Sequence, residues 1–206
     1  LPAVVLAMVL VFLYLPILVV VALSFNESRR GVHFTGFTLK WYQGLFQDPR
    51  VLEYFANTLV VALVSTLVST VLGTLLALGL VRYRFPGKGF LRYLLYVPVV
   101  VPDVVMGVSL LLLFAFSREL LGFPRLSLLT VILGHITFQV AFVTLVVRSR
   151  LLLLDPALEE AARDLGARGF QTFLHVTLPL AWPGVAAGAL LALTLSLDDF
   201  VVTFFT

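Results

Sequence analysis

Three carboxylates stand out because they lie within or beside long apolar stretches of the chain. Asp103 lies in VPVVVPDVVMGVSLLLLF (97–114), and Asp198 and Asp199 close a second apolar stretch. A carboxylate at the centre of a membrane helix costs about 2.5–3.5 kcal/mol on insertion scales, so it should face a helix bundle or a water-filled path. Because carboxylates along one path suit a substrate with several ammonium groups, we interpret all three as candidate substrate-path residues.

The same residues also have a structural interpretation. Asp103 could cap a helix or form a salt bridge that holds helices together. Asp198 and Asp199 could be the solvated end of a helix. The residue types alone leave both interpretations open.

A short charged stretch, DPALEEAARDLGARGF (155–170), interrupts the apolar sequence. It holds five charged residues within ten positions: Asp155, Glu159, Glu160, Arg163 and Asp164. Asp155 is a good N-cap, and Pro156 suits the first helical position, where its missing N–H is not needed. Gly166 supplies a break about ten residues later. The pattern therefore predicts one short helix with acidic residues near its positive end.

This predicted helix has a narrow apolar face with two alanines at its centre. The face consists of residues at positions i, i+3, i+4 and i+7: Leu158, Ala161, Ala162 and Leu165. A helix with small residues on its apolar face is shaped to lie in the groove of another protein. The alternative, a helix resting on lipid headgroups, would favour Lys, Arg and bulky apolar residues. The helix is net acidic, which favours a protein partner.

Motifs for catalysis and for cofactors are missing from the sequence. It contains no GxxxxGK[ST] phosphate loop, no HExxH and no GxSxG, and it has no Cys and only three scattered His residues. We therefore expect no enzymatic activity, no cofactor and no metal site in this chain. Any ATP would be bound by a partner.

The composition indicates an integral membrane protein. Of 206 residues, 61% are hydrophobic and 12% are charged, and the mean hydropathy is +1.09. Soluble domains have roughly 45–50% apolar and about 25% charged residues. The net charge of +3 is small and the basic residues lie between apolar runs, so we expect the lipid bilayer, and no nucleic acid, as a partner.

Five apolar runs reach the roughly 20 residues that a membrane helix needs. We expect spans at about 1–23, 57–81, 91–116, 127–147 and 178–197. The loop at 82–92 carries four basic residues and no acid, which places it in the cytoplasm together with the loop at 148–177. Segment 24–56 then lies outside, where Trp41 and Tyr42 of an interfacial helix over 38–46 would sit at headgroup level.

Small residues recur every four positions on three of these spans. The stripes are Ser65, Ser69, Gly73 and Ala77; Thr130, Gly134, Thr137 and Ala141; and Gly184, Gly188, Ala192 and Ser196. Such stripes let membrane helices approach closely, so they predict a packed bundle. His135 and Gln139 lie one turn apart on the fourth span, and we expect them to form interhelical hydrogen bonds rather than to contact a substrate.

The charged segment resembles the "EAA" cytoplasmic loop of ABC-importer permeases. The resemblance rests on Glu160-Ala161-Ala162, three residues, Gly166, nine residues, Val176, one residue and Leu178-Pro179; the family usually has Ile where Val176 stands. It implies a coupling helix that docks on an ATP-hydrolysing subunit. The residues that it implies for coupling are Glu159, Glu160, Ala161, Ala162, Leu165, Gly166 and Pro179.

The resemblance extends over nearly the whole chain and is strongest to the spermidine/putrescine branch. It rests on SFNESRRGVHFTGFTLKWYQGLFQDP (24–49), NTLVVALVSTLVSTVLGTLLALGLVRYRFPG (57–87) and SLDDFVVTFFT (196–206). It implies an all-α integral membrane protein, a polytopic helical bundle of the type I ABC-importer permease kind, with 1–206 forming a single transmembrane domain. That family has six spans, so a sixth is expected after Thr206.

The family resemblance also implies a set of partners, a location and a substrate. The partners are an ATP-binding cassette subunit in two copies, a second homologous permease subunit, and an external or periplasmic substrate-binding protein. The location is the bacterial plasma (inner) membrane. The implied substrate is a polyamine, although permeases for ferric iron, thiosulfate or phosphonate are closely related. From a different class, an ion-coupled secondary carrier or channel would use Asp103 as its ion-binding carboxylate.

The predicted orientation can be tested by cysteine labelling, because the native chain contains no cysteine. Single cysteines within 117–125 should react with an impermeant reagent added to intact cells, since that segment is predicted to be external. A cysteine at position 86 should stay unlabelled until the cells are opened. Labelling of position 86 from outside would overturn the orientation.

Overall fold

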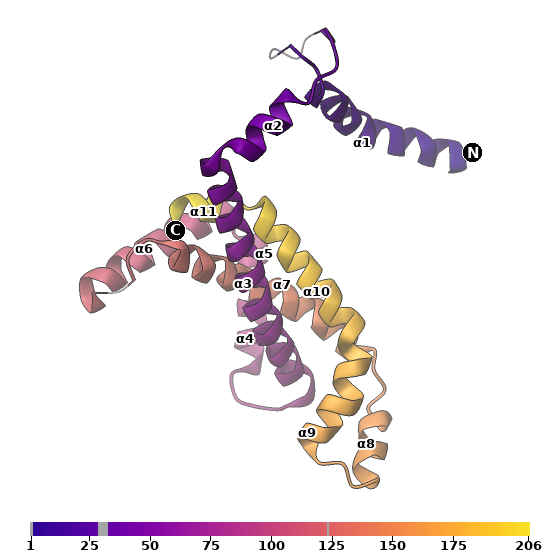
Figure 1. The fold of residues 1–206 in the computed structure, drawn as a ribbon. Helices are drawn as coiled ribbons and strands as arrows, with labels where there is room; N and C mark the ends of the chain where they lie inside the picture. Colours follow the sequence, from indigo (N-terminus) through magenta and orange to yellow (C-terminus); the bar gives the residue numbers. More distant parts are fainter. Residues whose placement is uncertain (1, 29–32, 123) are drawn as a thin grey trace. The chain divides into compact units, whose positions relative to one another are not determined.

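The computed structural model describes residues 2–28, 33–122 and 124–206 (Figure 1). The chain falls into two compact units, residues 1–56 and 57–206. Within the described ranges the structure is helical, apart from turns, loops and a single antiparallel bridge between Asn26 and Phe37. Five helices are long and apolar enough to cross a membrane: Pro2–Ser24, Pro49–Arg82, Asp103–Leu121, Leu128–Leu152 and Gly169–Asp198. The predicted all-α class is confirmed. Leu1, the first residue of the first expected span, lies outside the described residues.

The first unit contains helix α1 (Pro2–Ser24) and helix α2 (Lys40–Gln47). Between them, the buried side-chain oxygen of Asn26 accepts from the Thr35 N–H at 2.9 Å. Helix α2 is the short helix expected over 38–46. Two side chains of α2 bond to the segment before it: Trp41 Nε1 donates to the Asn26 carbonyl at 2.9 Å, and the Tyr42 hydroxyl lies 2.6 Å from Oγ of Ser24, the last residue of α1.

The core of the second unit is built from α3 (Pro49–Arg82) from Asn57 onward, α7 (Leu128–Leu152) and α10 (Leu178–Asp198). Figure 1 shows α10 beside α7, and the two helices pack along their length. Most residues of the predicted small-residue stripes lie at contacts among these three helices, whereas Thr130 and Gly134 of α7 face Val202 and Thr206. The buried members of the stripes are Ser65, Ser69, Gly73, Ala77, Thr130, Gly134, Ala141, Gly184, Gly188, Ala192 and Ser196. Thr137 is the exception: it is exposed, and its hydroxyl donates to the Leu133 carbonyl.

Val143 of α7 lies between two glycines on different helices. A Cβ atom at Gly73 of α3 would lie 2.7 Å from Val143 Cγ1, and one at Gly188 of α10 would lie 3.3 Å from the same atom. Val143 itself is fully buried. Since lipid gives membrane helices no hydrophobic reason to associate, contacts this close supply dispersion energy that holds the bundle together.

The third expected span, 91–116, is interrupted in the structure. Helices α4 (Lys88–Leu94) and α5 (Val97–Val100) precede α6 (Asp103–Leu121), and only α6 is long enough to cross a membrane. Pro98 and Pro102 explain the interruption, because proline lacks a backbone donor and disfavours helix in the residue before it. Asp103 consequently begins a helix and does not lie in the middle of one.

The loop after α7 contains α8 (Ala157–Asp164) and α9 (Gly169–Thr172). A π-helical turn, η1 (Phe173–Thr177), then leads without a break into α10. In η1 the N–H of Leu178 reaches back five residues to the Phe173 carbonyl. Such a turn re-spaces the backbone just before Pro179, which cannot donate a helical hydrogen bond. After α10, the short α11 (Val201–Phe205) packs against α6 and α7.

The glycine contacts on α3 give a matched pair of test substitutions. Gly73→Ala should destabilise the protein, because the new methyl group would meet Val143 and the Thr144 backbone, and overpacking costs about 1–3 kcal/mol. Gly79→Ala on the same helix meets nothing within 4 Å, and it should be neutral or stabilise by up to about 1 kcal/mol through helix propensity. Thermal unfolding in detergent measures both. A Gly73→Ala variant as stable as Gly79→Ala would contradict the close packing.

Candidate functional site: a carboxylate pocket and an exposed helix

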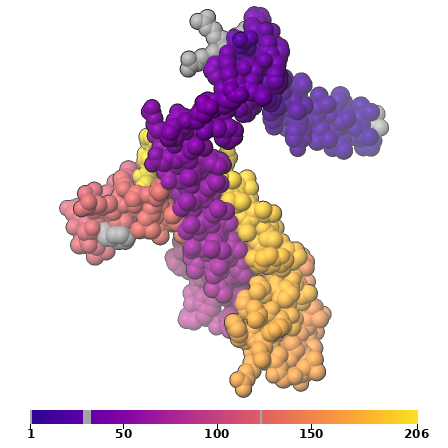
Figure 2. Space-filling model, in the orientation of Figure 1, coloured from indigo at the N-terminus to yellow at the C-terminus, as the bar shows by residue number. Residues whose placement is uncertain are grey.

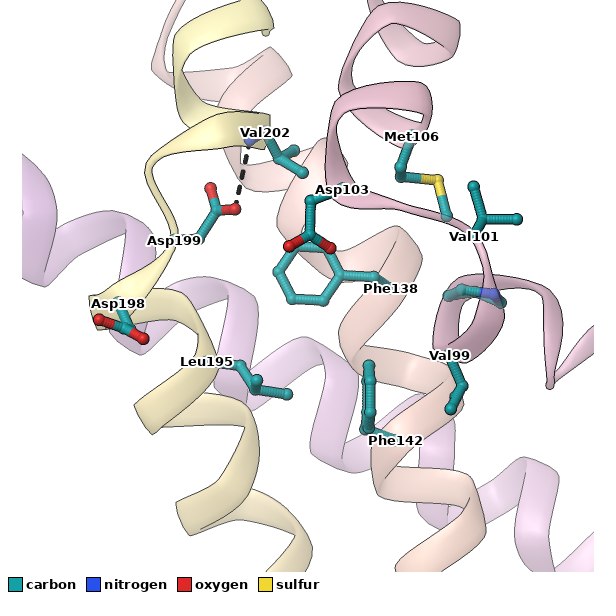
Figure 3. A pocket seen from close by; sticks show the side chains of 11 residues that line it. Val99, Val101, Asp103, Met106, Phe138, Phe142, Leu195, Asp198, Asp199 and Val202 are labelled. Carbon is teal, nitrogen blue, oxygen red and sulfur yellow. Dashed lines mark hydrogen bonds between the residues drawn. The ribbon is translucent and has the colours of Figure 1, made fainter.

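The three predicted carboxylates line one pocket of about 210 Å³ (Figure 3). Asp103 reaches it from the start of α6, and Asp198 and Asp199 reach it from the end of α10. The remaining wall is largely apolar and includes Phe138 and Phe142 of α7. Residues nearly a hundred positions apart in the sequence therefore meet at one place. We call this space the carboxylate pocket.

Asp103 and Asp198 have carboxylates without a hydrogen bond or ion pair to any of the described residues. Asp103 is the first residue of α6, where the positive end of the helix dipole favours a negative charge. Asp198 is the last residue of α10. Both residues are exposed in the isolated chain. Their charges are free to meet a cation in the carboxylate pocket.

Asp199 is bonded within the chain. One carboxylate oxygen accepts from the Val202 N–H at 3.2 Å, and the other accepts from the Thr203 N–H at 2.9 Å and the Thr203 hydroxyl at 3.1 Å. The same oxygen lies 3.3 Å from His135 Nε2. Asp199 therefore caps α11 and joins it to α7, while one side of it still faces the carboxylate pocket.

His135 and Gln139 form the interhelical hydrogen bonds that the sequence predicts. His135 Nδ1 lies 2.7 Å from Ser196 Oγ. Since the carboxylate of Asp199 can only accept, His135 carries a proton on Nε2. Gln139 accepts from the Ser69 hydroxyl at 3.0 Å and donates to the Ser65 hydroxyl at 3.2 Å and to the Ala192 carbonyl at 3.2 Å.

These side chains form one buried polar layer between α3, α7 and α10. Its members are Ser65, Ser69, His135, Gln139 and Ser196. An unpaired polar group in hydrocarbon costs several kcal/mol, so such side chains fix the helices in the one register that pairs them all. The buried polar layer lies next to Asp199 and thereby supports one wall of the carboxylate pocket.

The ends of helix α8 agree with the sequence prediction. Asp155 Oδ1 accepts from the Ala157 N–H at 2.9 Å, and Pro156 already has helical angles, which is the geometry of an N-cap followed by a first-position proline. At the other end Gly166 has φ +89°. Its N–H bonds to the Arg163 carbonyl, and the next N–H, from Ala167, bonds to the Ala162 carbonyl, which together make a Schellman motif.

The apolar face of α8 is open to solvent in this chain. Leu165 is 90% exposed, Leu158 and Ala161 are exposed, and Ala162 is half-buried. A groove of about 420 Å³ runs beside this face and is lined by Ala162, Leu165, Gly166 and Ala167 and by part of α9 and η1. Figure 2 shows this end of the second unit uncovered on the face in view. Exposed apolar groups rimmed by charges are typical of a protein–protein contact.

Glu159 does not belong to this open face. It is 8% exposed, and its carboxylate lies 3.0 Å from Arg82 Nη2. Oε1 accepts from Arg82 Nε at 3.1 Å and from the Thr177 hydroxyl at 2.8 Å. The neighbouring Glu160 is exposed. Of the residues that the sequence grouped for coupling, Glu159 is therefore turned inward, while Pro179 is an exposed residue of the first turn of α10.

Arg82 is the site residue that the sequence reasoning missed. In the sequence, Arg82 was counted only as one of the four basic residues that place the loop 82–92 in the cytoplasm. One available signal was its place at the end of a span on the same predicted side of the membrane as 155–170. That placement put a cation within reach of the acidic helix, but it could not select Arg82 over the other basic residues of the loop.

Membrane-length helices packed on small residues, a pocket of carboxylates and an exposed helix between two spans together define a polytopic membrane permease. Residues 69–206 match the family model described as binding-protein-dependent transport system inner membrane component, and the chain belongs to this family.

Curated relatives and a solved structure agree with this assignment. The chain is 43% identical over 194 residues to the spermidine/putrescine transport system permease protein PotC of Escherichia coli strain K12, covering 94% of this chain and 72% of that protein. It is 40% identical over 196 residues to the putrescine transport system permease protein PotI of the same strain, covering 94% and 70%. A bacterial ABC transporter involved in the import of the acidic polysaccharide alginate shares the fold, with a TM-score of 0.73 and 20% identity, covering 98% of this chain and 77% of that chain.

Proposed function

We propose that this chain is the permease subunit of an ABC importer and forms the translocation path for a polyamine such as spermidine or putrescine. The observation that carries the proposal is the convergence of Asp103, Asp198 and Asp199 on one pocket. The polyamine systems to which PotC and PotI belong point to the same substrate class. The alginate importer shares the fold but handles an acidic substrate, so the fold by itself does not decide between charges.

The carboxylate pocket is suited to ammonium groups on electrostatic grounds. Two unit charges 4 Å apart attract by about 4 kcal/mol at an effective dielectric constant of 20. Asp103 and Asp198 offer two free charges, and Phe138 and Phe142 offer aromatic faces for the methylene chain or for cation–π contact. A substrate with charges spaced along a flexible chain can meet these groups one after another as it passes.

Energy for transport would come from a partner, because this chain has no nucleotide-binding motif. We assign the exposed face of α8 (Leu158, Ala161, Ala162 and Leu165), together with Glu160, Gly166 and Pro179, to docking on an ATP-binding cassette subunit present in two copies. We call those four residues the docking face. A second homologous permease subunit and an external binding protein would complete the complex in the bacterial plasma membrane.

An ion-coupled carrier or channel is the alternative from another class. A carrier could use Asp103 as its ion ligand, but it has no need of an exposed helix shaped for a protein groove. Pull-down of the ATP-binding cassette subunit by this chain, with and without residues 155–179, separates the two. Retention that depends on 155–179 favours the importer, whereas a chain that transports without retaining the ATPase would be a carrier.

Substitution at the centre of the docking face should uncouple the transporter. Ala162→Asp adds volume and charge where a well-packed groove has no room, so the ATPase should be lost from the purified complex and uptake should fall with it. Ala162→Ser adds one oxygen at the same position and should keep most of both. Co-purification and uptake are measured on membrane-inserted protein. Normal transport by Ala162→Asp would count against docking through α8.

Removing the charge of Asp103 should lower transport without preventing assembly. Asp103→Asn keeps the shape of the side chain, and its neutral form is cheaper to bury, so insertion should survive. Uptake normalised to the amount of purified complex should fall, and Asp103→Glu should retain more activity than Asp103→Asn. Glu119→Gln, an exposed acid near the other end of α6, serves as the control and should leave uptake unchanged.

The two roles of Asp103 give different results in that assay. If Asp103 only holds helices together, Asp103→Asn lowers the yield of assembled complex and leaves the uptake per complex intact. That result would remove Asp103 from the substrate path.

A further inference from the structure

One buried carboxylate joins three helices at the end of the second unit. Glu159 belongs to α8, Arg82 is the last residue of α3, and Thr177 ends η1 directly before α10. Glu159 Oε1 lies within 3.1 Å of Arg82 Nε, of Arg82 Nη2 and of the Thr177 hydroxyl. A single oxygen atom is therefore the meeting point of the three elements.

The surroundings make this contact stronger than an ordinary surface ion pair. The side chains of Arg82 and Glu159 are 18% and 10% exposed, so water and salt screen their attraction only weakly. Arg163, four residues along α8, approaches the other oxygen of Glu159 at 3.8 Å but is 60% exposed. Removing one member of a buried pair leaves the other charge uncompensated, so Arg82 and Glu159 depend on each other.

We propose that Glu159 is a positioning residue: with Arg82 and Thr177 it ties the docking helix α8 to α3 and α10, so that a displacement of α8 moves both helices. This inference rests on the proposed coupling to an ATPase. In it, Glu159 faces the chain's own helices and does not contact the ATPase, which meets the docking face and Glu160. We call the bonds of Glu159 with Arg82 and Thr177 the tie. The tie and the docking face are thus two sides of the same two-turn helix.

Helices α3 and α10, which the tie joins to α8, lead from it toward the carboxylate pocket. Thr177 precedes α10, whose far end carries Asp198 and Asp199. Arg82 ends α3, whose Ser65 and Ser69 bond to Gln139 in the buried polar layer. Without the tie, α8 would be joined to α10 through the turn at 165–168, where Gly166 has a left-handed backbone, and through its packing on α9 and η1.

The test compares three variants in the complete complex: Glu159→Gln, Arg82→Gln and the double variant. Reconstituted complexes are assayed for ATPase retention, for ATP hydrolysis and for polyamine taken up per ATP hydrolysed. Each single variant should retain the ATPase within about twofold, while uptake per ATP should fall at least about tenfold, which corresponds to about 1.4 kcal/mol of lost coupling. Uptake per ATP in the double variant should be no lower than in the more impaired single variant, because both substitutions break the same interaction.

Exposed neighbours of the same residue types serve as matched controls. Arg84→Gln removes an exposed arginine two residues from Arg82 and should leave uptake per ATP unchanged. Glu160→Gln removes the exposed acid next to Glu159, and any loss there should appear in ATPase retention and not in uptake per ATP.

Three patterns would overturn the inference. One is loss of ATPase retention in Glu159→Gln while Arg82→Gln behaves as wild type, since Glu159 would then bind the ATPase itself. The second is an unchanged ratio of uptake to ATP hydrolysed in every variant, and the third is additive losses in the double variant. A wild-type complex that neither retains the ATPase nor imports a polyamine would instead refute the proposed function, and it is recognised before any variant is compared.

Discussion

The structure depends on the close approach of α3, α7 and α10, which lipid alone does not drive. Gly73 and Gly188 let two helices contact Val143 of the third, and the buried polar layer then joins all three through hydrogen bonds. The contacts with Val143 need small residues, and the hydrogen bonds need the members of the buried polar layer to lie opposite one another. These two conditions together select one register of the helices. Within the second unit, the segments attached to the ends of these helices inherit their positions from that register.

Helix α10 connects the two candidate sites. It is continuous with η1 and α9 at one end, beside α8, and it carries Asp198 and Asp199 at the other. A continuous helix transmits a shift along its axis better than a chain with loops does. The chain before α6, in contrast, is interrupted by prolines. Asp103 is therefore the first residue of α6 and faces the same pocket from the start of a helix.

Features that depend on neighbouring residues could be predicted from the sequence. The particular bonds between residues far apart in the sequence could not. The N-cap at Asp155, the left-handed Gly166 and the four-residue spacing of the stripes follow from helix geometry within a few turns. A hydropathy window treats 91–116 as one span, since it ignores how Pro98 and Pro102 divide it. The bond from Arg82 to Glu159 joins residues 77 positions apart. The bonds from Asp199 to α11 depend on a turn for which the sequence carries no turn motif. The sequence therefore suggested both candidate sites, and the structure distinguishes the buried Glu159 from the exposed Glu160.

The central claim is that ATP hydrolysis in a partner moves a polycation past the carboxylate pocket. Its most direct measurement is accumulation of labelled polyamines by membranes that carry the complete complex, set against ferric iron, thiosulfate and phosphonate. The account predicts ATP-dependent accumulation of a polyamine, with other polyamines competing and the two anions without effect. Accumulation of an anion in place of a polyamine, or uptake driven by an ion gradient in the absence of ATP, would contradict it.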